Sequence, residues 1–170
     1  GDEWTDEMLS KVVAVDKTYA HTGKDVTYLA SCDIEGAKIS YFYEDDLLPD
    51  VFTTNKAGEY KITVRVDVEW FLPYKEEVIF TVLPLALEDL KVDFGLFETS
   101  VNVLSEFAMP TYRVTHKITE EDLTSAVTLS ARSGAYKVED LTEQTTLYSA
   151  NIVGIMNWTY KLNGLTIKEI

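Results

Sequence analysis

The side chains best suited to recognising a ligand form an aromatic run, Trp70-Phe71-Leu72-Pro73-Tyr74. Aromatic rings offer flat apolar area at a low cost in side-chain entropy, which suits stacking on sugars or filling a partner's pocket. Pro73 cannot donate to a β-ladder, so the run is expected at a hairpin end, where loops carry function. The sequence therefore gives Trp70, Phe71 and Tyr74 as ligand-binding candidates. The structural alternative is that Trp70 ends a core-facing row and caps the core, or packs on a second domain.

A second candidate is acidic. Glu44, Asp45, Asp46 and Asp50 lie within seven residues of one another. Calcium binds about six to eight oxygen ligands, which carboxylates and backbone carbonyls supply. The segment lacks the Asp-x-Asp-x-Asp-Gly spacing of a known calcium loop, so we interpret it as a solvated turn, with a calcium site as the weaker alternative.

Motifs for catalysis are absent from the sequence. It contains no glycine-rich phosphate loop, His-Glu-x-x-His, Cys-x-x-Cys or Gly-x-Ser-x-Gly. Its two histidines, His21 and His116, are far apart and are expected on the surface, which disfavours a zinc site. The single cysteine, Cys32, cannot form an internal disulfide and is expected to be a buried thiol. We therefore expect no enzyme and no cofactor. A small hydrolase using two carboxylates distant in the chain remains a remote alternative.

Charge narrows the class of partner. The 170 residues carry a formal net charge of −14. Residues 1–84 hold 17 acidic and 8 basic side chains, and residues 85–170 hold 12 and 7, so both halves are acidic. Such a surface repels phosphate backbones and anionic lipid headgroups, which argues against nucleic acid and membranes as partners. No run of about 18 apolar residues is present, so no membrane insertion is expected.

The elements that must position these side chains are strands. Residues 59–70 alternate without a break, with Tyr60 to Trp70 at even positions apolar and the odd positions polar. This period of two predicts an antiparallel strand laid over a core. Further strands are expected at 11–15, 26–32, 37–43, 51–54, 76–83, 98–104, 111–116, 124–131, 135–138 and 145–149. A turn of helix is plausible within residues 1–10, and another at Ile118–Leu123. The fold class is therefore all-β.

Two halves of similar length are predicted. Pro84 closes the first unit, giving domains at 1–84 and 85–170. A faint repeat supports the division, because residues 58–66 and 154–162 both read as a glycine followed by apolar residues at period two. In the second half Asn163-Gly164 separates two apolar alternating runs. Asn-Gly is the preferred two-residue hairpin turn, since both positions take positive φ.

The first half resembles the bacterial immunoglobulin-like repeats of surface and secreted proteins. The resemblance lies in residues 19–24 (Tyr-Ala-His-Thr-Gly-Lys), 35–41 (Glu-Gly-Ala-Lys-Ile-Ser-Tyr) and 55–64 (Asn-Lys-Ala-Gly-Glu-Tyr-Lys-Ile-Thr-Val). The opening has two more residues than the family's pattern. The second half looks like another such domain through residues 108–114, although Met156 stands where the family has tyrosine.

The resemblance implies two tandem immunoglobulin-like β-sandwiches in an extracellular or cell-surface setting. The expected function is a non-enzymatic spacer or adhesive module of an exported bacterial protein. The alternative is a carbohydrate-binding accessory module of a secreted enzyme. The corresponding partners are a glycan or a host or matrix protein.

Overall fold

The computed structural model describes residues 1–95, 100, 102, 104–108, 111–133, 136–141, 147–149 and 154–170. Within these ranges the chain is a β-protein whose helices are a single four-residue α-helix, α1 (Asp6–Leu9), and two 3-10 turns, η1 (Leu87–Asp89) and η2 (Thr124–Ala126). The prediction of an all-β fold is confirmed. The chain divides into two compact units, Gly1–Pro84 and Leu85–Ile170.

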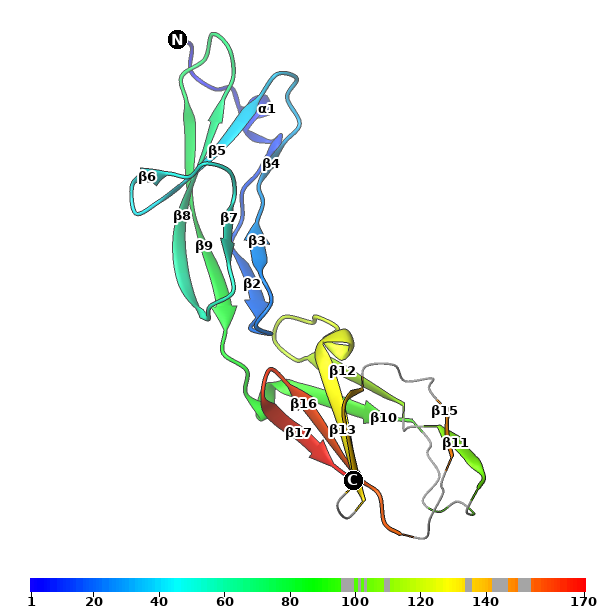
Figure 1. Ribbon diagram of the computed structural model, residues 1–170. Coiled ribbons are helices and arrows are strands. Elements are labelled where there is room, and N and C mark those ends of the chain that lie inside the picture. The colour runs from blue at the N-terminus through cyan, green and yellow to red at the C-terminus, as the bar shows by residue number, and fades with distance from the viewer. Residues whose placement is uncertain are drawn as a thin grey trace. The chain divides into compact units, whose positions relative to one another are not determined.

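Unit 1 contains one five-stranded sheet and two strand pairs (Figure 1). The sheet has the order β2-β9-β8-β5-β6, and its neighbours are antiparallel except for the parallel β2–β9 pair. The pairs β1–β4 and β3–β7 are antiparallel. The strands are β1 (Val12–Val13), β2 (Lys17–Ala20), β3 (Val26–Tyr28), β4 (Ser31–Cys32), β5 (Lys38–Tyr43), β6 (Asp46–Leu47), β7 (Phe52–Thr54), β8 (Gly58–Asp67) and β9 (Tyr74–Leu83).

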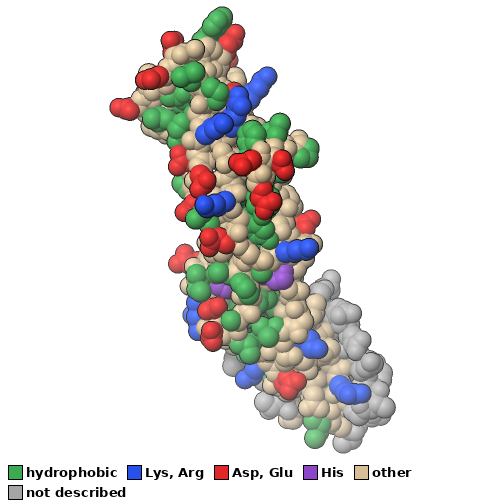
Figure 2. Space-filling model, turned by 90° about the vertical axis from the view of Figure 1, so that its left-hand side faces the viewer, with side chains coloured by type: hydrophobic (Ala, Val, Ile, Leu, Met, Phe, Trp, Pro, Cys, Tyr) green, Lys and Arg blue, Asp and Glu red, His purple; other side chains and the backbone are tan. Residues whose placement is uncertain are grey.

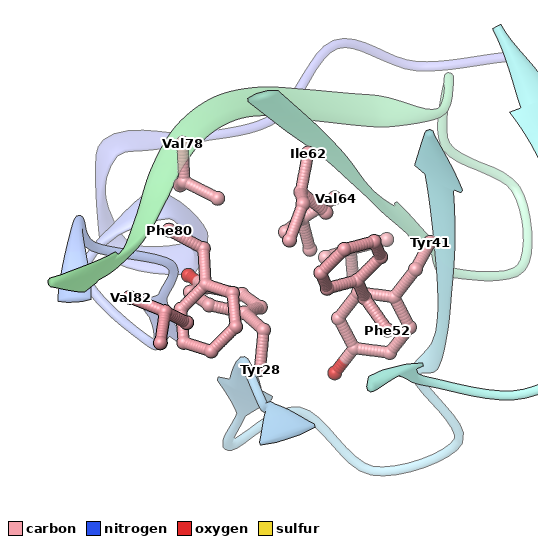
Figure 3. Close-up of a cluster of buried hydrophobic side chains, with 9 residues drawn as sticks. Tyr28, Tyr41, Phe52, Ile62, Val64, Val78, Phe80 and Val82 are labelled. Carbon is pink, nitrogen blue, oxygen red and sulfur yellow. The ribbon is translucent and has the colours of Figure 1, made fainter. Parts of the chain in front are cut away.

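The alternation of β8 buries one face of this sheet. Ile62, Val64 and Val66 are fully buried, while the residues between them are partly exposed. Their partners across the ladder include Val78 of β9 and Tyr41 of β5, and strand β3 contributes the fully buried ring of Tyr28. Figure 3 shows that these side chains converge on one cluster. The buried members are Tyr28, Tyr41, Phe52, Ile62, Val64, Val66, Val78, Phe80 and Val82.

Four expectations for unit 1 need correction. Residues 26–32 form two short strands, β3 and β4, which pair with different partners, and not one strand. The strand predicted to reach residue 70 ends at Asp67, and Trp70 lies outside the core-facing row because the backbone turns before it. Residues 11–15 do not form one strand, since β1 covers only Val12–Val13. Cys32 is only partly buried, because its two-residue strand lies at the margin of the core cluster. The expected helical turn within residues 1–10 is present as α1, which Thr5 caps by accepting from Met8 N–H.

Unit 2 contains a four-stranded antiparallel sheet with the order β14-β13-β16-β17, and the antiparallel pairs β10–β12 and β11–β15. Its buried side chains include Leu129, Tyr160 and Leu162. The expected strand at 98–104 lies largely outside the described residues. The strands are β10 (Leu90–Phe94), β11 (Glu106–Ala108), β12 (Tyr112–His116), β13 (Val127–Ser133), β14 (Tyr136–Leu141), β15 (Leu147–Ser149), β16 (Asn157–Leu162) and β17 (Leu165–Glu169).

Two expectations for unit 2 are wrong and one is confirmed. His116 is 1% exposed rather than on the surface, because the even-numbered residues of β12 face the core. The helical turn expected at Ile118–Leu123 is absent. Asp122 instead accepts from Thr124 N–H and precedes η2. The Asn163-Gly164 turn is confirmed: both residues have positive φ, and Leu162 pairs with Leu165 across it.

The two units share a sheet order. In unit 1 the succession β6-β5-β8-β9 is antiparallel throughout, and unit 2 repeats it as β14-β13-β16-β17. Strands β8 and β16, which carry the repeated sequence pattern, therefore hold corresponding places in their sheets. The connections that follow them, β8–β9 and β16–β17, are corresponding hairpin ends.

Candidate functional site

The candidate site lies on the connection between β8 and β9. Val66 pairs with Tyr74, so the connection begins after Asp67 and ends at Pro73. Phe71 N–H donates to the carbonyl of Val68 at 3.1 Å, closing a four-residue turn. Trp70 occupies the third position of that turn with φ of 72°. A glycine usually occupies such a position, because a Cβ atom crowds the backbone there.

Trp70 presents its side chain to solvent. The residue is 78% exposed, the highest value among the exposed large hydrophobic residues of the described chain. Leu72, two residues on, is 48% exposed. A left-handed backbone costs a residue other than glycine about 1–2 kcal/mol, and a bulky side chain in that conformation is uncommon. The protein therefore maintains a strained turn that displays its largest apolar side chain in water.

The N-terminal segment is hydrogen-bonded to this turn. Asp2 N–H donates to the carbonyl of Trp70 at 2.8 Å, and Leu72 N–H donates to the carbonyl of Asp2 at 2.8 Å. Asp2 and Phe71 thus form an isolated parallel bridge. Trp4 adds a third link, since its indole Nε1 donates to the carbonyl of Leu72 at 2.7 Å. These hydrogen bonds at Trp70 and Leu72, together with the Phe71–Val68 bond across the turn, hold the backbone in its unfavourable conformation.

Tyr74 connects the Trp70 turn to the core of unit 1. It starts the inward row of β9 and packs on the core cluster. Its ring lies 5.3 Å from that of Trp4, measured between centroids, with the planes tilted by 37°. The hydroxyl donates to a carboxylate oxygen of Glu76. That hydrogen bond, with burial and the negative charge of Glu76 adding to it, raises the pKa of Tyr74. Tyr74 therefore anchors Trp4, which in turn holds Leu72.

The candidate aromatic residues are neighbours that differ in exposure. Trp70 projects outward, whereas Phe71 and Tyr74 are half-buried. In Figure 1 the β8–β9 turn and the N-terminus lie at the same end of unit 1, and Figure 2 shows apolar and acidic side chains mixed over that end. We call the surface formed by Asp2, Glu3, Trp4 and residues 69–74 the Trp70 surface.

Sequence reasoning missed the part played by Trp4. Sixty-eight residues separate it from its hydrogen-bond acceptor on Leu72, and no local pattern signals a contact over that distance. The available signal was compositional: an indole in an otherwise polar opening segment, Gly1 to Thr5, needs an apolar surface to cover it.

The acidic candidate is a hairpin turn and not a metal centre. Glu44 and Asp45 have φ of 52° and 65°, and Tyr43 pairs with Asp46 across them, so they are the two central residues of the β5–β6 turn. Asp50 lies beyond β6 in the loop that leads to β7. Among the residues that the structure describes, no group of three or more histidine, cysteine or acidic side chains is placed to hold a metal ion. The proposed calcium set of Glu44, Asp45, Asp46 and Asp50 therefore does not converge.

His21 and Cys32 belong to unit 1 and His116 belongs to unit 2, and each histidine has hydrogen-bond partners of its own. A ring nitrogen of His21 is 2.8 Å from the carbonyl oxygen of Asn55, in unit 1. His116 belongs to unit 2, where its Nδ1 accepts from the backbone N–H groups of Ile118 and Thr119.

Over the described part of the chain, no helix has the length and apolar character needed to cross a bilayer.

Comparison with known proteins gives distant structural likeness only. No family model matches the chain, and no curated protein matches it. Among solved structures, the chain is similar to SGBP-B of the Bacteroides ovatus mixed-linkage glucan utilization locus, solved in complex with a mixed-linkage heptasaccharide. The TM-score is 0.35 with 8% sequence identity, over 91% of this chain and 65% of that one. The chain thus spans a little under two thirds of the length of that protein.

Proposed function

We propose that this chain is a non-enzymatic recognition module of an exported or cell-surface protein, and that unit 1 binds a glycan through the Trp70 surface. This reading develops the carbohydrate-binding alternative from the sequence. It also accommodates an adhesive role, because a surface protein that binds a glycan adheres through it. A spacer without a ligand is the competing proposal.

The observation that carries the proposal is the combination of strain and exposure at Trp70. Its turn costs free energy through the positive φ, and a 78% exposed indole gains little from burial. Residues held in unfavourable backbone regions cluster at binding sites, where the surrounding structure over-determines them. Here the hydrogen bonds of Asp2 and Trp4 do so. A flat indole held rigidly in solvent suits stacking on the apolar face of a sugar ring.

The architecture supports a surface module. We infer that both units are immunoglobulin-like sandwiches. The order β2-β9-β8-β5-β6 places β8 and β9, the last two strands of unit 1, beside β5, and the β3–β7 pair supplies the second layer. Immunoglobulin-type domains have this arrangement, in which strands C, F and G form one sheet and B pairs with E in the other. Loops clustered at the ends of such sandwiches bind ligands in many cell-surface proteins.

The experiment is a glycan and matrix-protein array probed with the purified chain and with Trp70→Gly. Glycine is the informative replacement because it removes the ring and also suits φ of 72°. We expect Trp70→Gly to lose glycan binding by at least about 30-fold, in the range of a binding hot spot. Its free energy of unfolding should stay equal or rise by about 1 kcal/mol.

Leu47→Ala provides the matched control. Leu47 is an exposed aliphatic residue of unit 1 on β6, so its replacement also removes surface apolar area. Glycan binding by Leu47→Ala should match that of the unchanged chain. If the folded chain binds no glycan, the proposal fails and the spacer remains. If Trp70→Gly binds as well as the unchanged chain, the Trp70 surface is not the site.

A further inference from the structure

The charge around the Trp70 surface is one-sided. Residues 1–7 and 67–77 lie side by side through the Asp2–Phe71 bridge. Together they contain eight acidic residues and one lysine, Lys75. Glu69 immediately precedes Trp70 in the turn, and Glu3 lies between the two residues that fasten the turn, Asp2 and Trp4. Both glutamates are exposed.

Resting on the glycan-binding function proposed above, we propose that the Trp70 surface selects uncharged glycans and rejects glycans that carry carboxylate or sulfate groups. Glu3 and Glu69 are the residues that set this selectivity. The indole supplies the attraction, which depends on the shape and apolar face of a sugar ring and requires no charge on the ligand. The surrounding carboxylates supply the discrimination, because like charges brought close together raise the free energy of the complex.

Distance makes this repulsion effective. Glu69 is the next residue to Trp70, and Glu3 follows Asp2, whose backbone is hydrogen-bonded to that of Trp70, so both carboxylates are within one or two side-chain lengths of a sugar stacked on the indole. The screening length in about 0.15 M salt is about 8 Å, so several carboxylates act on the same ligand. At a few ångströms each pair contributes on the order of half to one kcal/mol in water. Two or three such pairs weaken the binding of an anionic ligand about tenfold.

Selection of this kind is built from charge placement and needs no pocket. A glycan that carries no charge meets only the ring and backbone groups of the turn. A polyuronate or sulfated glycan with the same ring geometry must bring negative charges beside Glu3 and Glu69. Lys75 is the one basic side chain within the two segments, and Arg65 outside them is paired with Asp67 at 3.0 Å, so acidic side chains still outnumber basic ones around the turn.

The test uses three matched pairs of polysaccharides: hydroxyethyl cellulose with carboxymethyl cellulose, arabinoxylan with glucuronoxylan, and fully methyl-esterified polygalacturonate with polygalacturonate. Binding to the full chain is measured for each polymer by affinity electrophoresis and titration, in about 20 mM and about 0.5 M NaCl. We expect at least one uncharged polymer to bind with little dependence on salt. Its charged counterpart should bind about tenfold more weakly at low salt, and the difference should shrink at high salt.

A variant without two of the carboxylates tests whether Glu3 and Glu69 cause the weaker binding of charged polymers. Glu3→Gln combined with Glu69→Gln should reduce the ratio of the two dissociation constants to about threefold or less at low salt. Asp25→Asn combined with Glu59→Gln removes two charges near the opposite end of β8, where Val26 pairs with Thr54 and Glu59 with Thr81. This control should leave the ratio unchanged.

The outcomes separate the two proposals. If a charged polymer binds as tightly as its uncharged partner, the selectivity is overturned while glycan binding stands. If the control pair lowers the ratio as much as the Glu3 and Glu69 pair, overall net charge is responsible and the assignment to these residues is overturned. If no polysaccharide binds, or if only a matrix protein binds, glycan binding itself fails and the selectivity fails with it.

Discussion

Two corresponding hairpin ends show how one sheet order can carry different surface chemistry. Strands β16 and β17 are joined by Asn163 and Gly164, with φ of 47° and 79°. Strands β8 and β9 are joined by six residues that include Trp70 at φ of 72°. Asparagine and glycine accept a left-handed backbone at low cost, whereas tryptophan does not.

In a protein made of similar units, recognition is expected where one unit departs from the local preference that the other follows. The β16–β17 turn satisfies local backbone preference and displays little side-chain surface. The β8–β9 turn contradicts local preference, and it persists because Asp2 and Trp4 hold it through hydrogen bonds from a distant part of the chain. Conflict between local and tertiary preference is concentrated at functional sites.

The cores differ as well. Unit 1 is built around aromatic rings: that of Phe80 lies within 6.4 Å of four others, those of Tyr19, Tyr28, Phe52 and Tyr60, measured between centroids. Unit 2 has fewer ring contacts, with Tyr160 packed between Phe94 and Tyr112, and it also buries the ring of His116, whose Nε2 has no partner within the described residues.

The largest expected effect is on the core of unit 1. Phe80→Ala removes a fully buried ring and should lower the free energy of unfolding of unit 1 by about 3–5 kcal/mol. Leu129→Ala in unit 2 should cost about 2–5 kcal/mol. Amide hydrogen exchange distinguishes the units, because Phe80→Ala should expose the amides of β8 and β9 and spare those of β13 and β16. Equal loss of protection in both units would show that they unfold together.

Exchanging the turns tests the functional contrast. Replacing Asp67–Pro73 with Asn-Gly gives β8–β9 the connection of β16–β17. The hairpin should be retained because Asn-Gly favours it, whereas glycan affinity should fall by at least about 30-fold, or about 2 kcal/mol. Circular dichroism and binding are measured on the same sample. Retention of full affinity by the exchanged chain would place recognition elsewhere in the molecule.

The buried ring of His116 distinguishes the core of unit 2 from that of unit 1. Nδ1 of His116 accepts from Ile118 N–H at 3.2 Å and from Thr119 N–H at 3.1 Å. His116→Ala leaves both donors without this acceptor and should destabilise unit 2 by about 1–3 kcal/mol. His116→Asn keeps an acceptor oxygen near the place of Nδ1 and should cost less. Urea unfolding gives the free energy of unfolding of both variants. Equal losses for His116→Ala and His116→Asn would mean that packing of the ring, and not hydrogen-bond acceptance by Nδ1, stabilises unit 2.

The smallest effect at neutral pH concerns a feature common to both units. Burial raises the pKa of Tyr28 to about 12 and that of Tyr160 to about 12. The ordinary tyrosine pKa is about 10, so the folded state holds its phenol protons more tightly than the unfolded state. Stability from this source is complete below pH of about 10 and is lost as pH rises towards about 12.

Replacing each tyrosine with phenylalanine should reduce this alkaline loss in its own unit. Tyr28→Phe also removes the hydrogen bond to the carbonyl of Val15, at a cost of about 1 kcal/mol at every pH. Unfolding free energies at pH values of about 8, 10 and 11 separate the two contributions. An unchanged alkaline slope in both variants would assign the loss to other groups.

Local sequence pattern was sufficient for most of the sheet framework. The alternation in residues 59–67 and 76–83 predicted β8 and most of β9, and Asn163-Gly164 predicted the turn between β16 and β17. These features depend on the period of two along a strand and on the φ preferences of turn residues, which act over a few residues. The burial of His116 was not predicted, because its polar ring was taken as a surface group although it shares the parity of Tyr112 and Val114, the core-facing residues of β12.

The sequence by itself determined that the protein is all-β, that its surface is acidic and that its largest aromatic run, which contains Pro73, lies at a hairpin end. Only the tertiary structure decided that the apolar alternation stops before Trp70 and leaves that ring in solvent. The physical reason is the range of the interactions involved. Strand periodicity is written into neighbouring residues, whereas the conformation of Trp70 depends on hydrogen bonds from Asp2 and Trp4, nearly 70 residues away in the chain.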